Sequence, residues 1–337
     1  MGVTFERAVS NLEAAARALY QNDRSIHAVG VSRHDDGFGF RVIRNSKKIE
    51  AFAAAAALPA IADIPVSYVD AANGAYSLVK KIPASPLAEP LVPEQQFFRP
   101  LVCGHQIQNF DDDVRQGHPQ QGFIIIGTLG CFVVLSGDEQ HTYMLSNNHV
   151  VAAENRGLKG QDRILQQGTT SFEQTQLAAT LANFVEIQFS DEHATFADGN
   201  ALLNDIDAGI ARVQAEVVAG KGYLPLRNLS APHGTTAPQV GDKVLKVGRT
   251  TGLTRGTITQ YPTIVGPVDY GGQPAWFRNS IEIEGDGGTN FSDRGDSGSA
   301  IIKAGTGEVV GLLYAGNGQQ TYACPIDAVL AQLDCSI

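Results

Sequence analysis

Short apolar runs, each ended by glycine, asparagine or aspartate, dominate the sequence from residue 101 to the end. Examples are FIIIGTLGCFVVL, KVLKVG, SIEIEG and EVVGLLYAG. Many strand-sized runs with turns at regular intervals are typical of β-barrels and sandwiches. The 36 glycines of the chain are numerous enough to supply those turns. We therefore predict a mainly β fold, a barrel or a sandwich, for residues 101–337.

The preceding part of the chain predicts a small α+β domain over residues 1–82. Two segments indicate helices, through apolar spacings of three and four or through alanine content: residues 3–22 and 49–61. Three runs are typical of strands: residues 25–33, 38–45 and 64–71. The sequence HDDG between the first two strands is a hairpin signal. We predict a regulatory role for this domain, with substrate docking and assembly into homo-oligomers as alternatives.

A proline-rich segment, residues 83–100, follows this domain. Its prolines lie at positions 83, 86, 90, 93 and 100. Proline cannot donate a backbone hydrogen bond, which excludes a continuous helix or a central strand. The segment therefore predicts an extended linker between two domains.

The charge balance limits the partners of the chain. Its formal net charge of -10 argues against nucleic acid or an anionic membrane, because both require a basic surface. Charged residues interrupt the N-terminal segment repeatedly, so neither a signal peptide nor a transmembrane span is predicted there. We therefore expect a cytoplasmic protein.

Neither the cysteines nor the acidic residues predict a metal site, and no cofactor is predicted. The four cysteines include no CxxC pair. We expect free thiols, with a Cys103–Cys131 disulfide as the alternative. The run Asp111–Asp113 lacks the spacing of a calcium-binding loop, and we expect it to form a solvated acidic loop.

Three segments carry residues suited to acyl-transfer chemistry. In YMLSNNHVV, an apolar strand ends in small polar residues that precede His149. In NDIDAGIARV, Asp205 and Asp207 come just before an apolar strand. In DRGDSGSA, Ser297 lies in a glycine-rich turn that leads into a buried strand.

Peptide cleavage by serine requires these residue types. A serine hydroxyl is a weak nucleophile at neutral pH, so a base must take its proton during attack. Imidazole can do so and can then protonate the leaving amine. A buried carboxylate fixes the imidazole tautomer, and backbone N–H groups stabilise the oxyanion. The three segments therefore predict a His-Asp-Ser triad, with either Asp205 or Asp207 as the acid and a simple glycine-rich turn as the alternative interpretation of GDSG.

The same segments resemble a known superfamily. SNNHVV, DAGIARV and GDSGSA resemble the three catalytic motifs of the trypsin/chymotrypsin superfamily, above all of its bacterial members. VGRTTGLTRGTI resembles a strand–turn–strand of the α-lytic protease and streptogrisin group, although Arg255 stands where those secreted enzymes carry a disulfide cysteine. VGVSR, FRVIRNSKK, IPVSYVD and RPLVCG resemble the trypsin-like proteins related to the plant narrow-leaf protein. The resemblance implies a chymotrypsin-like double β-barrel.

The resemblance also implies a role for each matched residue. His149 is the general base and Ser297 the nucleophile. Asp207 is the preferred acid, because the acid of this superfamily directly precedes a small-apolar strand, and Asp205 remains the alternative. The backbone N–H groups of Gly295 and Ser297 form the oxyanion hole.

The substrate-binding residues are implied in the same way. Tyr314, Ala315 and Gly316 lie on a strand that resembles the one pairing with an extended substrate, with an ordinary core strand as the alternative. Phe291 falls at the base of the primary pocket, where trypsin-type enzymes carry an aspartate. We therefore expect an apolar or small side chain in this pocket rather than Lys or Arg, unless Asp293 points inward.

These observations predict a serine endopeptidase that hydrolyses peptide bonds through an acyl-enzyme. Its partners would be protein or peptide substrates. The alternatives are a catalytically silent scaffold of the same fold, which would keep the barrels without the chemistry, and an esterase that shares the chemistry.

Overall fold

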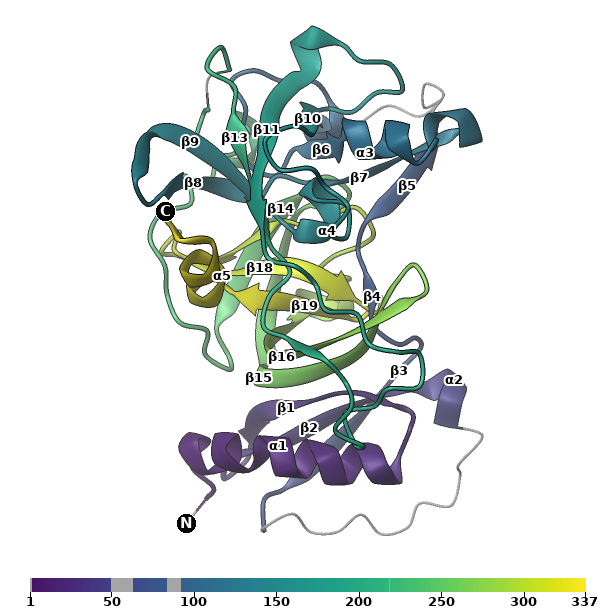
Figure 1. Ribbon diagram of the computed structural model, residues 1–337. Helices are drawn as coiled ribbons and strands as arrows, with labels where there is room; N and C mark the ends of the chain where they lie inside the picture. Colours follow the sequence, from purple (N-terminus) through teal and green to yellow (C-terminus); the bar gives the residue numbers. More distant parts are fainter. Residues whose placement is uncertain (1, 50–62, 84–91, 218) are drawn as a thin grey trace.

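Figure 1 shows a computed structural model that describes residues 2–49, 63–83, 92–217 and 219–337. Two β-sheets form its upper and middle parts, and the larger sheet continues below them into strands that lie beside α1. The helix predicted at 49–61 falls almost entirely outside the described residues, as does the middle of the predicted linker. The helices are α1 (Phe5–Asn22), α2 (Ser46–Ile49), α3 (Phe110–Arg115), α4 (Asn148–Val151) and α5 (Ile326–Leu333).

One sheet has nine strands in the described residues, in the order β20-β8-β9-β13-β11-β10-β6-β7-β5. They are β5 (Lys80–Pro83), β6 (Gln106–Asn109), β7 (Phe123–Thr128), β8 (Cys131–Leu135), β9 (Asp138–Ser146), β10 (Arg163–Gln166), β11 (Leu177–Phe184), β13 (Gly209–Val213) and β20 (Cys335–Ser336). All of these neighbours pair antiparallel. Gly137, with a φ of 78°, closes the tight turn between β8 and β9.

The other sheet has eleven strands in the described part of the chain. One of them, β4, pairs with β15 and β18 outside the main strand order. They are β1 (Ile26–His34), β2 (Gly37–Asn45), β3 (Val66–Ala71), β4 (Tyr76–Ser77), β12 (Leu203–Asn204), β14 (Lys243–Gly248), β15 (Gly252–Tyr270), β16 (Gln273–Gly285), β17 (Ala300–Lys303), β18 (Val309–Gly316) and β19 (Gln320–Pro325). The register of β15 against β16 shifts at four places. Such bulges bend long strands and let a sheet curl upon itself.

The N-terminal strands continue this second sheet. β1 pairs antiparallel with β15 and with β2, and β3 pairs parallel with β2. Thr4 caps α1 by accepting a hydrogen bond from the backbone N–H of Arg7 at 3.3 Å. The apolar face of α1 packs on β1 and β2, and the Tyr20 ring meets Trp276 edge-to-face at 5.2 Å. The predicted α1, hairpin and third strand are confirmed.

The chain between Tyr76 and Pro83 connects the two sheets. β4 pairs with β18 of the second sheet, whereas β5 pairs with β7 of the first. In Figure 1 this segment passes β4 in the middle part of the molecule and rises to β5 near the top. It therefore runs along both sheets before the proline-rich region begins.

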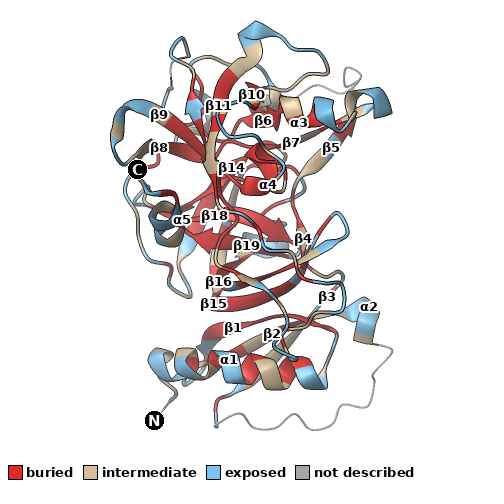
Figure 2. Ribbon diagram, viewed as in Figure 1, coloured by how far each residue is buried: buried red, intermediate tan, exposed pale blue. Residues whose placement is uncertain are grey.

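Buried residues run through both sheets and meet between them, around α4, β14 and β18 (Figure 2). One apolar cluster spans the two sheets and includes Leu145 of β9 and Leu312 of β18. Exposed residues gather in the loops and on the outer side of α1 (Figure 2). The junction of the sheets is therefore a packed, water-poor region.

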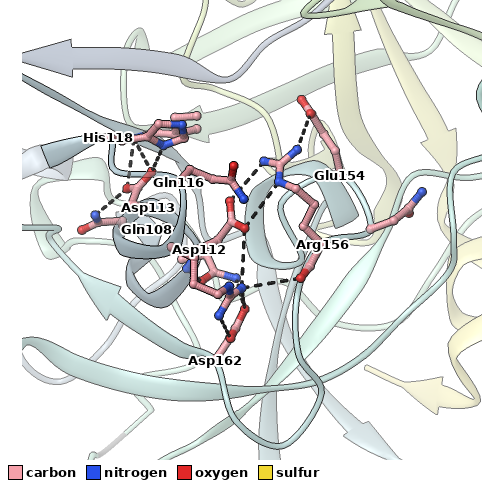
Figure 3. A network of polar contacts seen from close by, with 12 residues as sticks. Gln108, Asp112, Asp113, Gln116, His118, Glu154, Arg156 and Asp162 are labelled. Atoms are coloured by element: carbon pink, nitrogen blue, oxygen red, sulfur yellow. Dashed lines mark hydrogen bonds and ion pairs between the residues drawn. The ribbon is translucent and has the colours of Figure 1, made fainter. Parts of the chain in front are cut away.

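The prediction of a solvated acidic loop at Asp111–Asp113 is wrong. These residues lie in α3, where Asn109 caps the helix by accepting from the Asp112 N–H at 3.0 Å. Asp112 and Asp113 are each 2% exposed. Figure 3 shows their partners: Arg156 lies 3.1 Å from Asp112, and the His118 Nδ1 lies 2.7 Å from Asp113. Asp112 thus pairs with an arginine 44 residues away, a contact that the local sequence pattern does not reveal.

All four cysteines are unpaired in the structure, and the alternative of a Cys103–Cys131 disulfide is not formed. Both of these side chains are buried. Burial raises the pKa of the Cys131 thiol to about 12, and it also raises the pKa of the Cys103 thiol. Thiols held neutral in this way are poor nucleophiles and act as small apolar groups.

Candidate active site

The short helix α4 presents His149 at the end of β9. Asn147 and Asn148 hold the chain on both sides. The Asn147 Nδ2 donates to the carbonyl of Asp207 at 2.7 Å, and the Asn148 Nδ2 donates to the carbonyl of Val185 at 2.6 Å. These bonds explain why small amide residues precede the histidine, and they leave its imidazole completely buried.

Asp207 lies against His149 just before β13. Its Oδ2 contacts the His149 Nδ1, and its Oδ1 accepts from the His149 backbone N–H at 3.3 Å. The Asp207 N–H points to the Cys324 Sγ at 3.3 Å. Both side chains are fully buried, so little water competes for the contact. A carboxylate in this position holds Nδ1 toward itself and leaves Nε2 for chemistry.

Asp205 lies elsewhere. Its Oδ1 accepts from the Arg278 Nε at 2.6 Å, and its side chain is 33% exposed. Residues i and i+2 of an extended chain point to the same face, yet here the loop before β13 sends the two carboxylates to different partners. The structure therefore brings Asp207, and not Asp205, to His149.

Tyr270 contacts both His149 and Asp207, and the sequence did not indicate this residue. Its hydroxyl donates to the Asp207 Oδ2 at 2.8 Å, and its ring lies edge-on to the His149 ring with centroids 5.5 Å apart. Burial, followed by the charge of Asp207, raises the pKa of Tyr270 well above its usual value. The phenol therefore stays protonated and remains a donor. Tyr270 ends β15 outside any recognised motif, so no local signal marks it.

Ser297 lies in a turn whose backbone requires glycine both before and after the serine. Gly295 has a φ of 106° and Gly298 a φ of 92°. A Cβ at Gly298 would lie 2.1 Å from the Ser146 Oγ, and one at Gly295 would lie 2.4 Å from the Thr250 Oγ1. The sequence GDSG is therefore required here by backbone conformation and by close packing.

The serine turn and the histidine helix pack against the same strand. A Cβ at Gly127 of β7 would lie 2.5 Å from Val150 and 3.1 Å from the carbonyl oxygen of Ser297. The Ser297 Oγ donates to the carbonyl of Tyr314 at 3.3 Å. The His149 Nε2 is buried and has no hydrogen-bond partner among the described residues. The structure thus joins His149 to Asp207 and leaves the serine hydroxyl on Tyr314.

Asp296 braces the serine turn through a buried ion pair. Its Oδ2 lies 3.2 Å from the Lys246 Nζ, with both side chains completely buried. Its Oδ1 accepts from the Thr250 N–H at 2.8 Å, and its Oδ2 accepts from the Thr251 hydroxyl at 2.7 Å. Burial raises the pKa of Asp296, but Lys246 and these hydrogen bonds outweigh it and lower the pKa below its usual value. Asp296 raises the pKa of Lys246, but the stronger effect of burial lowers this pKa below its usual value.

The predicted oxyanion donor Gly295 already faces a carbonyl. Its backbone N–H donates to the carbonyl oxygen of Leu78. Leu78 lies between β4 and β5, far from the serine turn in sequence, so nothing in the sequence indicated this contact. A carbonyl group of the same chain, that of Leu78, therefore binds the N–H that was predicted to stabilise the oxyanion.

The four predicted substrate-binding residues lie in two places. Ala315 and Gly316 pair with Ser77 and Tyr76 of β4. Phe291 is completely buried. It belongs to an apolar cluster whose other buried members are Leu78, Val244, Ile258, Ile281, Ile283, Ile301, Val310, Leu313 and Ala323.

Tyr314 contributes to this region through its backbone only. Its ring is buried against Phe277, with centroids 4.5 Å apart, and its hydroxyl lies 2.9 Å from the Ser280 Oγ. Its carbonyl accepts from Ser297 and from the Leu78 N–H. Asp293 is exposed, so it does not enter the apolar cluster.

Within the described residues, no group of three or more His, Cys, Asp or Glu side chains is arranged to hold a metal ion. No helix in the same part of the chain is long and apolar enough to cross a membrane.

Comparison with family models places residues 106–323 in the family described as the Nal1 C-terminal domain. The chain belongs to this family. The match begins at β6, after α1 and β1 to β5, and includes His149, Asp207 and Ser297. The predicted relationship to trypsin-like proteins of the plant narrow-leaf group is thereby confirmed. No curated protein matches the chain significantly.

Solved bacterial proteases resemble this Nal1-family chain at low identity. Thermobifida fusca protease A is 16% identical, with a TM-score of 0.44 over 70% of this chain and 96% of that one. Cellulomonas bogoriensis chymotrypsin is 19% identical, with a TM-score of 0.41 over 62% and 89%. An α-lytic protease homologue, N4, is 16% identical, with a TM-score of 0.42 over 70% and 97%. The predicted mainly β architecture, with two sheets preceded by a helix and strands, is confirmed.

Proposed function

We propose that the chain is a serine endopeptidase that cleaves peptide bonds through an acyl-enzyme on Ser297. The observation that carries the proposal is the fully buried contact of the His149 Nδ1 with the Asp207 Oδ2. A scaffold has no need of a histidine and a carboxylate buried together, because desolvating such a pair is costly unless it serves a purpose. The nearby glycine-framed serine turn supplies a nucleophile of the required type.

The reaction begins when the Ser297 hydroxyl rotates from the Tyr314 carbonyl to the His149 Nε2. His149 takes the proton while the oxygen attacks the substrate carbonyl carbon. The backbone N–H groups of Gly295 and Ser297 stabilise the oxyanion, and Asp207 stabilises the imidazolium. The C–N bond then breaks, and His149 gives its proton to the leaving amine.

Hydrolysis completes the cycle. Water enters where the amine left and loses a proton to His149 as it attacks the ester on Ser297. The ester bond breaks, the acid product departs, and the proton returns to the serine oxygen. Tyr270 keeps the Asp207 carboxylate in place through both steps by its hydrogen bond of 2.8 Å.

A fluorophosphonate probe tests this function directly, because it reacts with activated serines. The full chain should be labelled on Ser297, and Ser297→Ala should abolish the labelling. Labelling that persists in Ser297→Ala would exclude Ser297 as the nucleophile. An esterase would also be labelled, so turnover of peptide amides against matched esters separates the two activities.

A catalytically silent scaffold is the second candidate. It is favoured by one observation, the hydrogen bond of the Ser297 hydroxyl to Tyr314 rather than to His149. In a scaffold, the fluorophosphonate probe would leave Ser297 unlabelled even when substrate has free access to the site. Peptidase chemistry predicts that Ser297 is labelled once access is free.

The proposed substrates are proteins or peptides, and the proposed compartment is the cytoplasm. The net charge of -10 supports the absence of nucleic-acid and membrane partners, because it weakens attraction to polyanions. Cell fractionation and a nucleic-acid binding assay at low salt test these two proposals.

A further inference from the structure

The segment from Tyr76 to Pro83 follows the path that an extended substrate would take across the site. On one side, Ser77 and Tyr76 pair antiparallel with Ala315 and Gly316 of β18. Strand addition of this kind is a general way in which proteins bind extended peptides. The pairing uses the very residues that the sequence indicated for substrate binding.

The backbone of Leu78 forms hydrogen bonds with β18 on one side and with the serine turn on the other. Its N–H donates to the carbonyl of Tyr314 at 3.3 Å, and its carbonyl oxygen accepts from the N–H of Gly295. The same Tyr314 carbonyl holds the Ser297 hydroxyl. The carbonyl of Leu78 therefore lies at an oxyanion donor, in the position that a reacting peptide would take.

The side chain of Leu78 packs in the apolar cluster of Phe291, the residue predicted to form the base of the primary pocket. It is 1% exposed and packs in the apolar cluster that contains Phe291 and Leu313. A Cβ at Gly316 would lie 3.2 Å from the Leu78 Cδ1, so a larger residue there would crowd the leucine. The pocket has the size and polarity of a branched aliphatic side chain.

The residues after Leu78 continue along the other sheet. In β5, Lys80 pairs with Ile126 and Ile82 pairs with Ile124 of β7. The Lys81 ammonium lies 4.8 Å from the centre of the Phe123 ring. The segment is thus bound on both sides of the Leu78–Val79 peptide bond (Figure 1).

We propose that Tyr76–Pro83 occupies the peptide-binding groove as a substrate does, with Leu78 in the primary pocket. Two consequences follow, and both rest on the function proposed above. The chain keeps its own groove closed in cis, since the Ser297 side chain is completely buried under this arrangement. Substrates that displace the segment carry leucine, or a similar aliphatic residue, before the cleaved bond.

An ordinary structural strand would explain the pairing with β18, but not the rest. Nothing in sheet formation requires the Leu78 carbonyl to meet the serine turn and its side chain to enter the Phe291 cluster at once. A hollow of about 770 Å³ borders the outer side of the segment, lined by Val79, Lys80, Tyr270 and Arg294 among others. Space beside the segment gives an incoming chain room to displace it.

Binding in a catalytically dead background tests the occupancy without relying on activity. The probe is a fluorescent synthetic peptide with the sequence of residues 76–83, YSLVKKIP. Full-length Ser297→Ala should bind it weakly because its groove is filled. Adding Leu78→Asp should strengthen binding at least tenfold, since a carboxylate in the apolar pocket expels the segment. Equal binding by the two proteins would overturn the proposal.

Two further variants guard this comparison. Leu226 is 60% exposed, and Leu226→Asp in the Ser297→Ala background should bind the peptide as weakly as Ser297→Ala alone. Leu78→Ala is the milder replacement if Leu78→Asp fails to give a cooperative thermal transition. It should strengthen peptide binding in the same direction, and no change with Leu78→Ala would also overturn the proposal.

Activity supplies the second measurement. With the active serine retained, Leu78→Asp should raise fluorophosphonate labelling at least tenfold over the wild type. It should also cleave a peptide with leucine before the scissile bond at least tenfold faster than the same peptide with arginine. A preference for arginine would overturn the pocket assignment. Failure of every variant to react would count against the peptidase function, while the peptide-binding result would still decide the occupancy.

Discussion

The hydroxyl of Tyr270 donates a hydrogen bond to the Asp207 Oδ2 at 2.8 Å, the same oxygen that contacts the His149 imidazole. The carboxylate therefore has partners on helix α4 and strand β15, which are far apart in the chain. A carboxylate held this way has less freedom to rotate, and the imidazole beside it keeps one orientation. In the proposed mechanism, Tyr270 acts through Asp207 as a positioning residue.

Replacing Tyr270 with phenylalanine should lower kcat about tenfold and leave KM nearly unchanged. The loss of a hydrogen bond to a charged acceptor should also lower the free energy of unfolding by about 1.5–3 kcal/mol. Steady-state kinetics and urea unfolding of the Leu78→Asp chain, with and without Tyr270→Phe, measure both effects. Tyr223 is a matched control, since its buried hydroxyl has no partner among the described residues, and Tyr223→Phe should lower neither quantity.

Lys246→Met should destabilise the chain by about 3–5 kcal/mol, because it leaves Asp296 charged and buried without its cation. The serine turn should loosen with it, so fluorophosphonate labelling should fall as well. Lys303 offers the comparison, since its pair with Asp242 is partly exposed and Lys303→Met should cost less than about 1 kcal/mol. Similar losses for the two lysines would show that the Lys246–Asp296 pair does not brace the turn.

Much of the fold and of the candidate site could be predicted from the sequence, because local sequence patterns indicate them. The glycines around Ser297 are dictated by a backbone of positive φ, and the run before His149 by the end of a strand. No local sequence pattern indicated Lys246, Tyr270 or Leu78. Each acts through a partner distant in sequence, and a buried lysine or a leucine near a domain boundary has the same local pattern whether or not it serves a site. The resemblance already favoured Asp207 over Asp205, but the Arg278 that binds Asp205 could not be predicted from the sequence.

Stability should fall in mild acid because of His27. Burial, with a smaller effect of Lys48, lowers the pKa of His27 to about 3 from its usual 6.5. The unfolded chain therefore takes up a proton between pH 6.5 and about 3 that the folded chain does not. The stability is fully present above pH 6.5, and it is lost at about 1.4 kcal/mol per pH unit as the pH falls through this range.

The variant His27→Gln should reduce that slope. Its amide oxygen can accept the bonds that the His27 Nε2 receives from Asn317 at 3.1 Å and Tyr322 at 3.3 Å. Denaturant unfolding at pH 7, 5.5 and 4.5 should show a dependence shallower by about 1.4 kcal/mol per pH unit. His193 is exposed, and His193→Gln should keep the wild-type slope. An unchanged slope in His27→Gln would contradict the assignment.

Gly316→Ala should narrow the primary pocket. The added Cβ would lie 3.2 Å from a leucine side chain placed as Leu78 is, and 3.0 Å from the Gln320 carbonyl oxygen. In the Leu78→Asp chain, kcat/KM for a leucine peptide should fall about tenfold, whereas that for an alanine peptide should fall much less. Parallel losses for both peptides would point to a general disturbance of β18 instead of a change in pocket size.

The most direct measurement maps the fluorophosphonate adduct by mass spectrometry in the full-length Leu78→Asp chain, whose groove should be open. The account predicts a single modified residue, Ser297, with labelling abolished in Ser297→Ala and greatly slowed in His149→Ala. An adduct on any other residue, or labelling that persists when Ser297 is replaced, would contradict the role of Ser297 as the nucleophile.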